Sequence, residues 1–246
     1  MTQENQKVAI VTGGSRGIGA AIAQRLAADG FAVVVNYAGN AQAANEVVKQ
    51  IEATGGRARA FQADVSDAGA TRAMFDAVEK EFGGVDVVVN NAGIMTVAPI
   101  ANVTDDDFDR LIAVNLKGTF NGLREAARRV RDGGRIVNFS TTVVGTKLET
   151  YSVYTATKAA VEAMTGIVAK EMRGRNITVN AVAPGPVATE LLLNGKTPEM
   201  LEMFAKAAPM ERLGTPDDIA NVVSFLAGPD GGWVNGQIIR ANGGLV

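Results

Sequence analysis

Short runs rich in valine and isoleucine alternate along the chain with longer segments of helical character, and this alternation constrains the fold more than any other feature. The predicted strands cover about 7–12, 31–36, 58–64, 85–93, 134–140, 177–185 and 236–244. The predicted helices cover about 17–29, 40–53, 68–82, 105–130, 151–173 and 216–228. Continuous apolar strands separated by helices are typical of a parallel sheet covered on both faces. The sequence therefore predicts an α/β architecture of three layers, with a doubly wound sheet of seven parallel strands.

The chain contains no internal boundary that would divide it. No linker rich in proline or serine, no low-complexity tract and no repeat separates one part of the 246 residues from another. Hydrophobic residues make up 47 per cent of the chain and aromatic residues only 5 per cent, so Ala, Val, Ile and Leu must build the interior. Residues 1–246 are therefore expected to form one domain.

Composition excludes several classes of function. The formal net charge of −2 gives no electrostatic basis for binding nucleic acid or a membrane, and no apolar run reaches the ~18 residues of a membrane span. A cytoplasmic location is the default expectation. The absence of cysteine and histidine rules out disulfides, thiol nucleophiles, Ser-His-Asp triads and zinc sites built from these residues. No acidic cluster suggests another metal site, so protons must move through Tyr, Lys, Asp, Glu or water.

A glycine-rich turn, "TGGSRGIG" at 12–19, connects the first predicted strand to the first predicted helix. Gly13, Gly17 and Gly19 allow a tight turn and a close approach of the backbone to a pyrophosphate. The start of the helix, with Ser15, Arg16 and Ile18, presents free N–H groups and the positive end of the helix dipole. This placement predicts dinucleotide binding, although a glycine-rich turn that binds nothing is the simpler alternative.

The end of the second predicted strand indicates which dinucleotide is bound. An acidic residue there would bind the adenosine ribose and repel a 2′-phosphate. This chain has the neutral residues Asn36, Tyr37 and Ala38 at that point, and no carboxylate occurs before Glu46. Arg16 offers a cationic group for the phosphate, unless it is merely a solvated loop residue. NADP(H) is therefore favoured over NAD(H).

A tyrosine and a lysine stand four residues apart in "YSVYTATKAA" at 151–160. Both side chains titrate near ~10 in water, which makes neither an obvious proton carrier at neutral pH. On a helix, Tyr154 and Lys158 share one face, so they are either a catalytic pair or two amphipathic residues on the helix surface.

Five segments together resemble a known family. "TGGSRGIG", "NNAG" at 90–93, "VNLKG" at 114–118, "YTATK" at 154–158 and "APGPVAT" at 183–189 occur in the order and spacing of the short-chain dehydrogenase/reductases, single-domain branch. The similarity extends from about Lys7 to Gly244, and it includes the 3-oxoacyl-(acyl carrier protein) reductases and related ketone reductases. The resemblance implies a Rossmann fold and hydride transfer between NADP(H) and a carbonyl compound or secondary alcohol.

The resemblance also assigns catalytic roles. Tyr154 would be the general acid and base, and Lys158 would hold the nicotinamide ribose while its ammonium group lowers the tyrosine pKa. Asn115 would position a water molecule that links Lys158 to solvent. The family's usual serine is replaced by Thr141, whose hydroxyl can make the same hydrogen bond to the substrate oxygen, with Ser140 as the alternative.

The remaining cofactor contacts follow from the same resemblance. The residues that it assigns to the adenine, to the cofactor path and to the nicotinamide carboxamide are, in chain order, Asp64, Val65, Asn90, Asn91, Ala92, Gly93, Pro184, Gly185, Val187 and Thr189. Structural roles remain open for some of them, since Asp64 could cap the next helix and Pro184–Gly185 could simply turn the chain.

The apolar segment at about 190–214 interrupts the alternation and is predicted to form a lid over a largely hydrophobic substrate. The basic stretch 124–135 suggests either docking of acyl carrier protein or a solvated helix face, and the solvated face is preferred. A homotetramer is expected from the family, with small residues such as Ala126 and Ala163 on the pairing helices. A regulatory protein that binds NADP(H) without catalysis is the alternative from another class.

Overall fold

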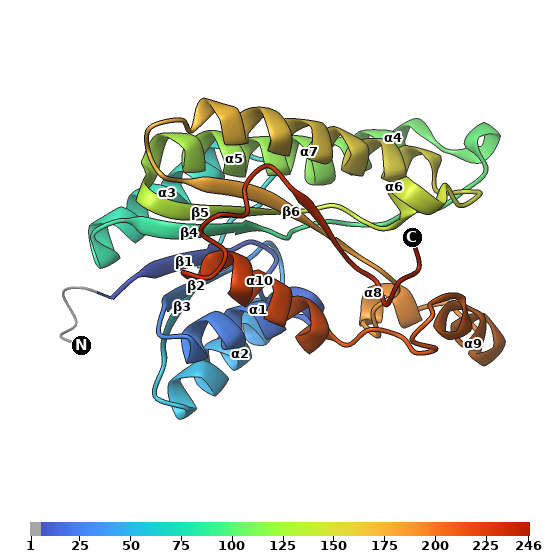
Figure 1. Ribbon diagram of the computed structural model, residues 1–246, viewed down its shortest axis with the longest axis horizontal. Coiled ribbons are helices and arrows are strands. Elements are labelled where there is room, and N and C mark those ends of the chain that lie inside the picture. The colour runs from blue at the N-terminus through green and yellow to red at the C-terminus, as the bar shows by residue number, and fades with distance from the viewer. Residues whose placement is uncertain (1–5) are drawn as a thin grey trace.

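The computed structural model describes residues 6–246, and its central feature is a parallel sheet of seven strands (Figure 1). The strand order is β3-β2-β1-β4-β5-β6-β7. The strands are β1 (Val8–Val11), β2 (Ala32–Tyr37), β3 (Arg57–Gln62), β4 (Val85–Asn90), β5 (Val130–Phe139), β6 (Thr178–Pro184) and β7 (Ile238–Ala241). The chain winds outward through β2 and β3 and then returns to the other side of β1, so the topological switch point lies between β1 and β4. The predicted doubly wound Rossmann-like sheet is confirmed.

Two layers of helices enclose the sheet, one on each face (Figure 1). One layer contains α1 (Gly17–Ala28), α2 (Ala41–Ala53) and α10 (Pro216–Ala227), and the other contains α3 (Ala68–Phe82), α5 (Gly118–Arg129) and α7 (Ser152–Glu171). Successive strand residues serve opposite layers, since Ala9 and Val11 pack with the first layer and Val8 and Ile10 with the second. Strands that are buried on both faces therefore need unbroken apolar sequence, which explains the valine-rich runs.

The predicted helix at 105–130 is one helical stretch with a change of geometry inside it. It begins as α4 (Asp105–Leu111), continues as the π-helical η3 (Ile112–Lys117) and ends as α5. Thr104 caps its start, because the threonine hydroxyl accepts a hydrogen bond from the Asp107 N–H at 3.1 Å. Hydrophobic periodicity could not reveal the π-helical turn, which adds one residue without breaking the helix.

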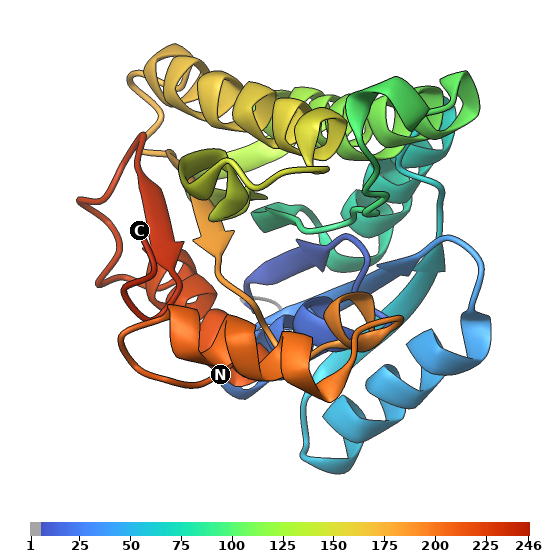
Figure 2. The ribbon, with the colours of Figure 1, turned by 90° about the vertical axis from the view of Figure 1, so that its right-hand side faces the viewer.

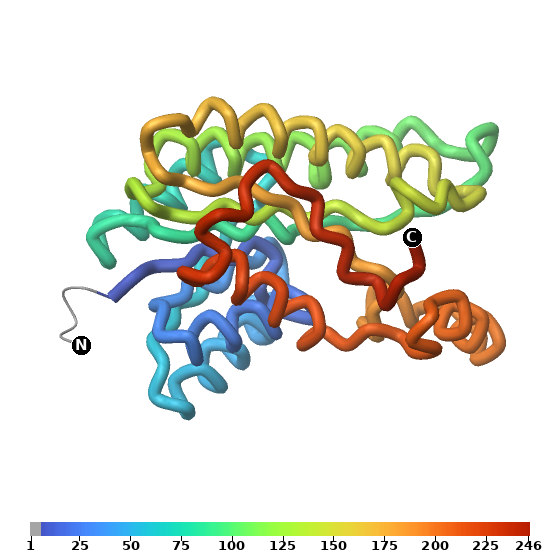
Figure 3. The backbone as a smooth tube through the Cα atoms, viewed as in Figure 1, coloured from blue at the N-terminus to red at the C-terminus, as the bar shows by residue number. Residues whose placement is uncertain are grey.

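The carboxyl ends of the strands face the 190–214 segment, which contains α8 (Glu190–Leu193) and α9 (Pro198–Ala207). Figure 2 views this end of the molecule and shows the orange helix α9 in front of the lower layer. The short helices η2 (Ile100–Asn102) and α6 (Val143–Thr146) follow β4 and β5 at the same end. The tube in Figure 3 shows the C-terminal segment returning toward the 190–214 segment, where the Met210 N–H donates to the Gly243 carbonyl.

Candidate active site

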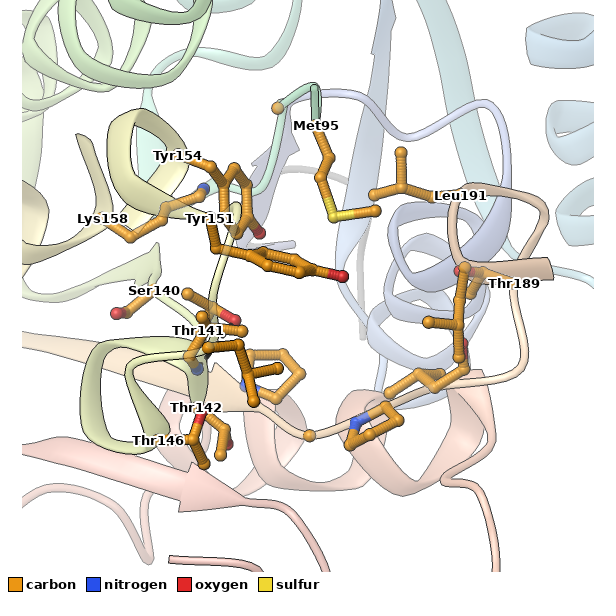
Figure 4. Close-up of a pocket in the computed structure, with 18 of the residues that line it drawn as sticks. Met95, Ser140, Thr141, Thr142, Thr146, Tyr151, Tyr154, Lys158, Thr189 and Leu191 are labelled. Carbon is orange, nitrogen blue, oxygen red and sulfur yellow. Dashed lines mark hydrogen bonds between the residues drawn. The ribbon is translucent and has the colours of Figure 1, made fainter. Parts of the chain in front are cut away.

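A cavity of about 400 Å³ opens at the carboxyl ends of β4, β5 and β6 (Figure 4). The loops after these strands form its floor, and the 190–214 segment contributes apolar side chains to its wall. The lining includes Ile94 and Met95 after β4, Ser140 to Val143 after β5, Tyr151, Tyr154 and Lys158 around the start of α7, and Leu191, Leu192, Met203 and Phe204 of the 190–214 segment. The cavity therefore combines a few polar groups with a mostly hydrophobic wall, which is typical of a site for small molecules.

Tyr154 lies in the first turn of α7 and presents its phenol to this cavity. Burial raises the pKa of Tyr154 to about 12, and a hydrogen bond with Thr141 opposes part of that rise. Desolvation therefore dominates the pKa of Tyr154 in this structure, and the lowering by Lys158 with an oxidised nicotinamide bound stays a prediction. A phenol with this pKa keeps its proton at neutral pH and can donate it.

Lys158 lies one turn after Tyr154 on the same face of α7, as predicted from the spacing. Its side chain is only 4% exposed, and its Nζ donates a hydrogen bond to the Phe139 carbonyl at 3.0 Å. The Nζ lies 6.0 Å from the centre of the Tyr154 ring. Burial lowers the pKa of Lys158 to about 8, because the charged ammonium loses its hydration.

The hydroxyl groups of Thr141 and Ser140 at the end of β5 were alternatives in the sequence analysis, and their surroundings in the structure differ. Thr141 is buried at the cavity wall, close enough to Tyr154 to oppose the rise of its pKa, and its hydroxyl accepts from the Val143 N–H at 3.3 Å. The Ser140 hydroxyl donates to Glu162 Oε1 at 2.6 Å, so it is already bound to a carboxylate. The Thr142 hydroxyl is likewise engaged, because it donates to the Ala183 carbonyl. The geometry thus favours Thr141 as the hydroxyl beside the tyrosine.

Asn115 lies in the π-helical turn η3 and is fully buried. Its side-chain amide binds one residue of the loop after β4, since Oδ1 accepts from the Ile94 N–H at 2.8 Å and Nδ2 donates to the Ile94 carbonyl at 2.9 Å. Nδ2 also lies 3.4 Å from Thr157 Oγ1. Asn115 therefore clamps the Gly93–Met95 stretch of the cavity floor onto α7, and its amide is occupied in doing so.

The glycine-rich turn is as tight as its sequence predicts. Gly13 and Gly17 have φ angles of +62° and +52°, in the left-handed region that glycine tolerates best. A Cβ added to Gly19 would overlap the Gly13 carbonyl oxygen and approach Asn91 Nδ2 to 2.6 Å. Asn36 is buried, and its Oδ1 accepts from the Gly13 N–H at 3.3 Å. The Asn36 side chain therefore points inward and holds the glycine-rich turn by this hydrogen bond.

Arg16 reaches across to the 190–214 segment. Its Nη1 pairs with Glu190 Oε2 at 3.0 Å, and both side chains are largely exposed. Thr189 is adjacent to the same turn, because a Cβ on Gly17 would lie 3.4 Å from its methyl group. The guanidinium was predicted to bind a phosphate, and here it binds a carboxylate, which indicates that the group is accessible to anions. Tyr37 and Ala38 are the more exposed residues at the end of β2.

The loops after β3 and β4 place the next group of predicted residues. Asp64 accepts hydrogen bonds from the N–H and hydroxyl of Ser66, while Asp67 caps α3, so the alternative of Asp64 as the helix cap is wrong. Val65 is buried and its carbonyl accepts from the Asn121 amide.

The two neighbouring asparagines after β4 have different surroundings. Asn90 is buried and its Nδ2 donates to Asn138, whereas Asn91 lines the cavity and donates to the carbonyls of Thr12 and Gly13. The Thr12 hydroxyl in turn accepts from the Asn91 and Ala92 N–H groups. Asn91 and Ala92 thus fasten the glycine-rich turn to the loop after β4, across the switch point.

The segment after β6 completes the site. Pro184, Gly185, Val187 and Thr189 all line the cavity. A Cβ on Gly185 would lie 2.8 Å from Asn242 Cα, so this glycine is required for close packing against the end of β7. Val187 pairs with Gly214 in an isolated parallel bridge, which joins the chain just before the 190–214 segment to the last residue of that segment.

The start of α1 supplies the groups that a dinucleotide phosphate needs. Arg16 is the N-cap residue of α1, and its side chain makes no capping bond. The first backbone hydrogen bond of the helix runs from the Ala20 N–H to the Arg16 carbonyl. The earlier N–H groups of α1 therefore face the turn as donors, with the positive end of the helix dipole behind them. Ile18 of α1 and Asn91 both line the cavity, so the glycine-rich turn lies beside it, as a bound dinucleotide requires.

Within residues 6–246, no group of three or more acidic residues is arranged to hold a metal ion. In the same part of the chain, no helix is both long and apolar enough to span a membrane.

Comparisons with known proteins agree with this geometry. A family model described as enoyl-(acyl carrier protein) reductase matches residues 13–246. A short-chain type dehydrogenase/reductase of Picea abies is 46% identical over 250 residues, covering 98% of this chain and 92% of the relative. An NADPH-dependent aldehyde reductase-like protein, chloroplastic, of Arabidopsis thaliana is 45% identical over 254 residues, covering 98% of this chain and 94% of that protein.

The solved structures lead to the same family. A short-chain dehydrogenase from Burkholderia cenocepacia in complex with NADP superimposes with a TM-score of 0.92 at 40% identity, covering 97% of both chains. The protein belongs to the short-chain dehydrogenase/reductase superfamily of oxidoreductases, which confirms the resemblance read from the five sequence segments.

Sequence reasoning missed two features of the site. Glu190 forms an ion pair with Arg16, and nothing in the sequence marked it as a site residue except its position next to Thr189. Leu245 lines the cavity from the C-terminal segment, and no periodicity links a terminal residue to a distant pocket.

Proposed function

We propose that the protein is an NADP(H)-dependent oxidoreductase that transfers a hydride between the nicotinamide and a carbonyl compound or secondary alcohol. The observation that carries this proposal is the placement of Tyr154 and Lys158, one helical turn apart, at the polar end of an apolar cavity. The NADP-bound relative from B. cenocepacia and the NADPH-dependent relative from A. thaliana support the choice of cofactor.

In the direction of reduction, Tyr154 is the general acid. NADPH supplies the hydride for the carbonyl carbon when it is bound here. Tyr154 donates its phenolic proton to the carbonyl oxygen, the C=O double bond becomes a C–O single bond, and the product is a secondary alcohol. Thr141 donates a hydrogen bond to the same oxygen and positions it. The positive charge of Lys158 stabilises the phenolate that remains, and solvent returns the proton.

The cofactor residues are those that surround the glycine-rich turn and the loop after β4. Donor N–H groups at the start of α1 suit the pyrophosphate, and Arg16 suits the 2′-phosphate. Titration with NADPH and NADH, followed by cofactor fluorescence, tests this preference. Tighter binding of NADH would refute the assignment of Arg16 and the role of the neutral residues Tyr37 and Ala38.

The 190–214 segment is proposed as the lid. Its side chains Leu191, Met203 and Phe204 line the cavity, and Glu190 contacts Arg16 of the glycine-rich turn. Such a segment excludes water while the hydride moves, and it favours hydrophobic substrates. Replacing Phe204 by alanine is expected to raise KM for aromatic ketones more than for acetone.

Replacement of the tyrosine is the first test of the reaction. Tyr154→Phe removes the proton donor and keeps the ring, so NADPH consumption with a panel of ketones is expected to fall by about 100-fold or more. NADPH binding, followed by fluorescence, should change little. A protein that binds NADPH but reduces none of a broad ketone panel would favour the alternative of a regulatory protein without catalysis.

The neighbouring hydroxyls are separated by a matched pair of variants. Thr141→Val replaces the hydroxyl by a methyl group of similar size and is expected to lower kcat. Ser140→Ala removes a hydroxyl that is bound to Glu162 and should affect kcat less. Loss of turnover in Ser140→Ala alone would show that the assignment of Thr141 is wrong.

A reductase specific for acyl carrier protein receives less support. The basic stretch 124–135 is largely neutralised by ion pairs, since Arg129 binds Asp76 and Arg131 binds Asp86. A basic docking surface needs unpaired cations. We therefore expect free ketones to be better substrates than thioesters on the carrier.

A homotetramer remains part of the proposal. Phe120 on α5 and Ile167 on α7 are exposed on the outer face of the second layer, and Trp233 before β7 is 97% exposed. Apolar side chains in these positions are typical of subunit interfaces. Ala163 lies on the same open face, whereas Ala126 is buried in the core and cannot contribute. Light scattering that gives the monomer mass would contradict this part.

A further inference from the structure

The hydroxyl group of Tyr151 takes no part in the proposed hydride and proton transfer. Tyr151 lines the cavity, and its ring stands edge-on to that of Tyr154 with the centroids 6.3 Å apart. Figure 4 shows its hydroxyl directed into the open part of the cavity, toward the side on which Thr189 and Leu191 lie. Burial raises the pKa of Tyr151, and no hydrogen bond to its hydroxyl is found within residues 6–246. Its oxygen is open to the cavity, where a ligand can replace water as the hydrogen-bond partner.

The backbone before Tyr151 is held in an unfavourable conformation. Thr150 has a φ of +71°, which is an outlier for a β-branched residue. Its carbonyl accepts a hydrogen bond from the Ala98 N–H at 2.9 Å, so the loop after β4 fixes this geometry. Strain that the surrounding structure maintains is commonly found at ligand sites. Here the strained residue directly precedes the phenol that faces the cavity.

Most other polar groups of this part of the cavity already have partners, and the exception is the Thr146 hydroxyl, whose oxygen is buried at the cavity wall without one in the described part of the chain. Ser140 is bound to Glu162 and Thr142 to the Ala183 carbonyl, while Thr141 and Tyr154 serve the reacting oxygen. Tyr151 thus offers a free donor and acceptor in a predominantly apolar wall, displaced from the reacting centre.

We propose that the Tyr151 hydroxyl binds a second oxygen atom of the substrate, remote from the reacting carbonyl, and that the substrates are apolar ring ketones carrying a further hydroxyl or carbonyl group. This inference rests on the proposed function, because it assumes that the reacting carbonyl lies at Tyr154. Tyr151 is in this scheme a specificity-determining residue. A site built to bind a substrate hydroxyl discriminates against the analogue that lacks it.

Equilibrium binding tests this role without turnover. The protein loaded with NADP⁺ cannot reduce a ketone, so calorimetry can measure the affinity of 1-tetralone and of its 5-, 6- and 7-hydroxy derivatives. Tyr151→Phe is expected to weaken binding of at least one hydroxy derivative by about fivefold to tenfold, the equivalent of one neutral hydrogen bond. Binding of 1-tetralone itself should change less than about twofold. Equal changes for all four ketones, or none, would overturn the proposal.

Kinetics and stability provide readouts that a structural role would not reproduce. With NADPH, Tyr151→Phe should raise KM for the same hydroxy derivative and leave kcat nearly unchanged. Tyr151→Phe should also leave the melting temperature nearly unchanged, because the ring stays in place. A lower melting temperature together with an equal loss of affinity for all four ketones would indicate that Tyr151 is retained for packing, against the proposal.

Failure of the proposed function is recognised separately. That function fails if Tyr154→Phe reduces ketones as fast as the wild type, whatever the binding data show. The role of Tyr151 fails if the binding data show no dependence on the substrate hydroxyl, even where Tyr154→Phe is inactive.

Discussion

The buried ammonium group of Lys158 should make the stability of the protein depend on pH in a predictable direction. Burial lowers the pKa of Lys158 from 10.5 to about 8 in the folded protein. Between these values the unfolded chain holds a proton that the folded protein has released, so the free energy of unfolding rises with pH. Below about pH 8 both states are protonated, and this contribution is flat.

The size of the effect follows from the same two pKa values. The full difference between 10.5 and about 8 corresponds to about 3 kcal/mol, of which about 2 kcal/mol appears between pH ~7 and pH ~9.5. Tyr154 opposes this trend at higher pH, because its pKa is raised to about 12 in the folded protein. The measurement therefore has to stay below pH ~10, the ordinary pKa of tyrosine.

The variant Lys158→Met isolates the lysine. It also leaves the Phe139 carbonyl without its donor, which costs about 1–3 kcal/mol at every pH, so stability at one pH is not decisive. Urea unfolding of both proteins at a series of pH values gives the difference in their free energies of unfolding. Between pH ~7 and pH ~9.5, the free energy of unfolding of the wild type should rise by about 2 kcal/mol relative to that of the variant. A difference that stays constant with pH would refute the reasoning.

Three further predictions concern the cofactor site and one helix. Arg16→Gln should weaken NADPH binding about tenfold and NADH binding less than about twofold, as cofactor fluorescence will show. Gly19→Ala should abolish NADPH binding, because its Cβ overlaps the Gly13 carbonyl, whereas Gly39→Ala adds a methyl group in open space and should bind normally. Thr215→Ala removes half of the capping box of α10 and should lower the free energy of unfolding by about 1 kcal/mol in urea titrations.

The sequence predicted the sheet well because buried parallel strands leave an unambiguous signal. Every predicted strand corresponds to one in the structure, and the predicted helices differ mainly at their ends, whereas η2, α8 and α9 were not predicted as helices. The short helix α6 was not predicted, since four residues after a strand carry no periodicity. The position of the glycine-rich turn could also be predicted, because few residues other than glycine tolerate the φ angles of Gly13 and Gly17.

The site was less predictable wherever burial decides the outcome. The spacing of Tyr154 and Lys158 fixed their common face, but not the direction of the tyrosine pKa, which depends on desolvation by residues from distant segments. The neutral character of Asn36 was evident, and its inward orientation was not. Periodicity in a strand gives two faces but does not say which polar residue supports a neighbouring turn.

The π-helical turn around Asn115 has a consequence for how this protein can change over evolution. One extra residue in a helical turn rotates everything after it by roughly 100° relative to a regular α-helix. Loss of a single residue between Ile112 and Lys117 would therefore turn Asn115 away from Ile94, or α5 away from the sheet. Insertions and deletions should therefore be eliminated from this stretch by selection. Its length in homologous chains should thus be constant.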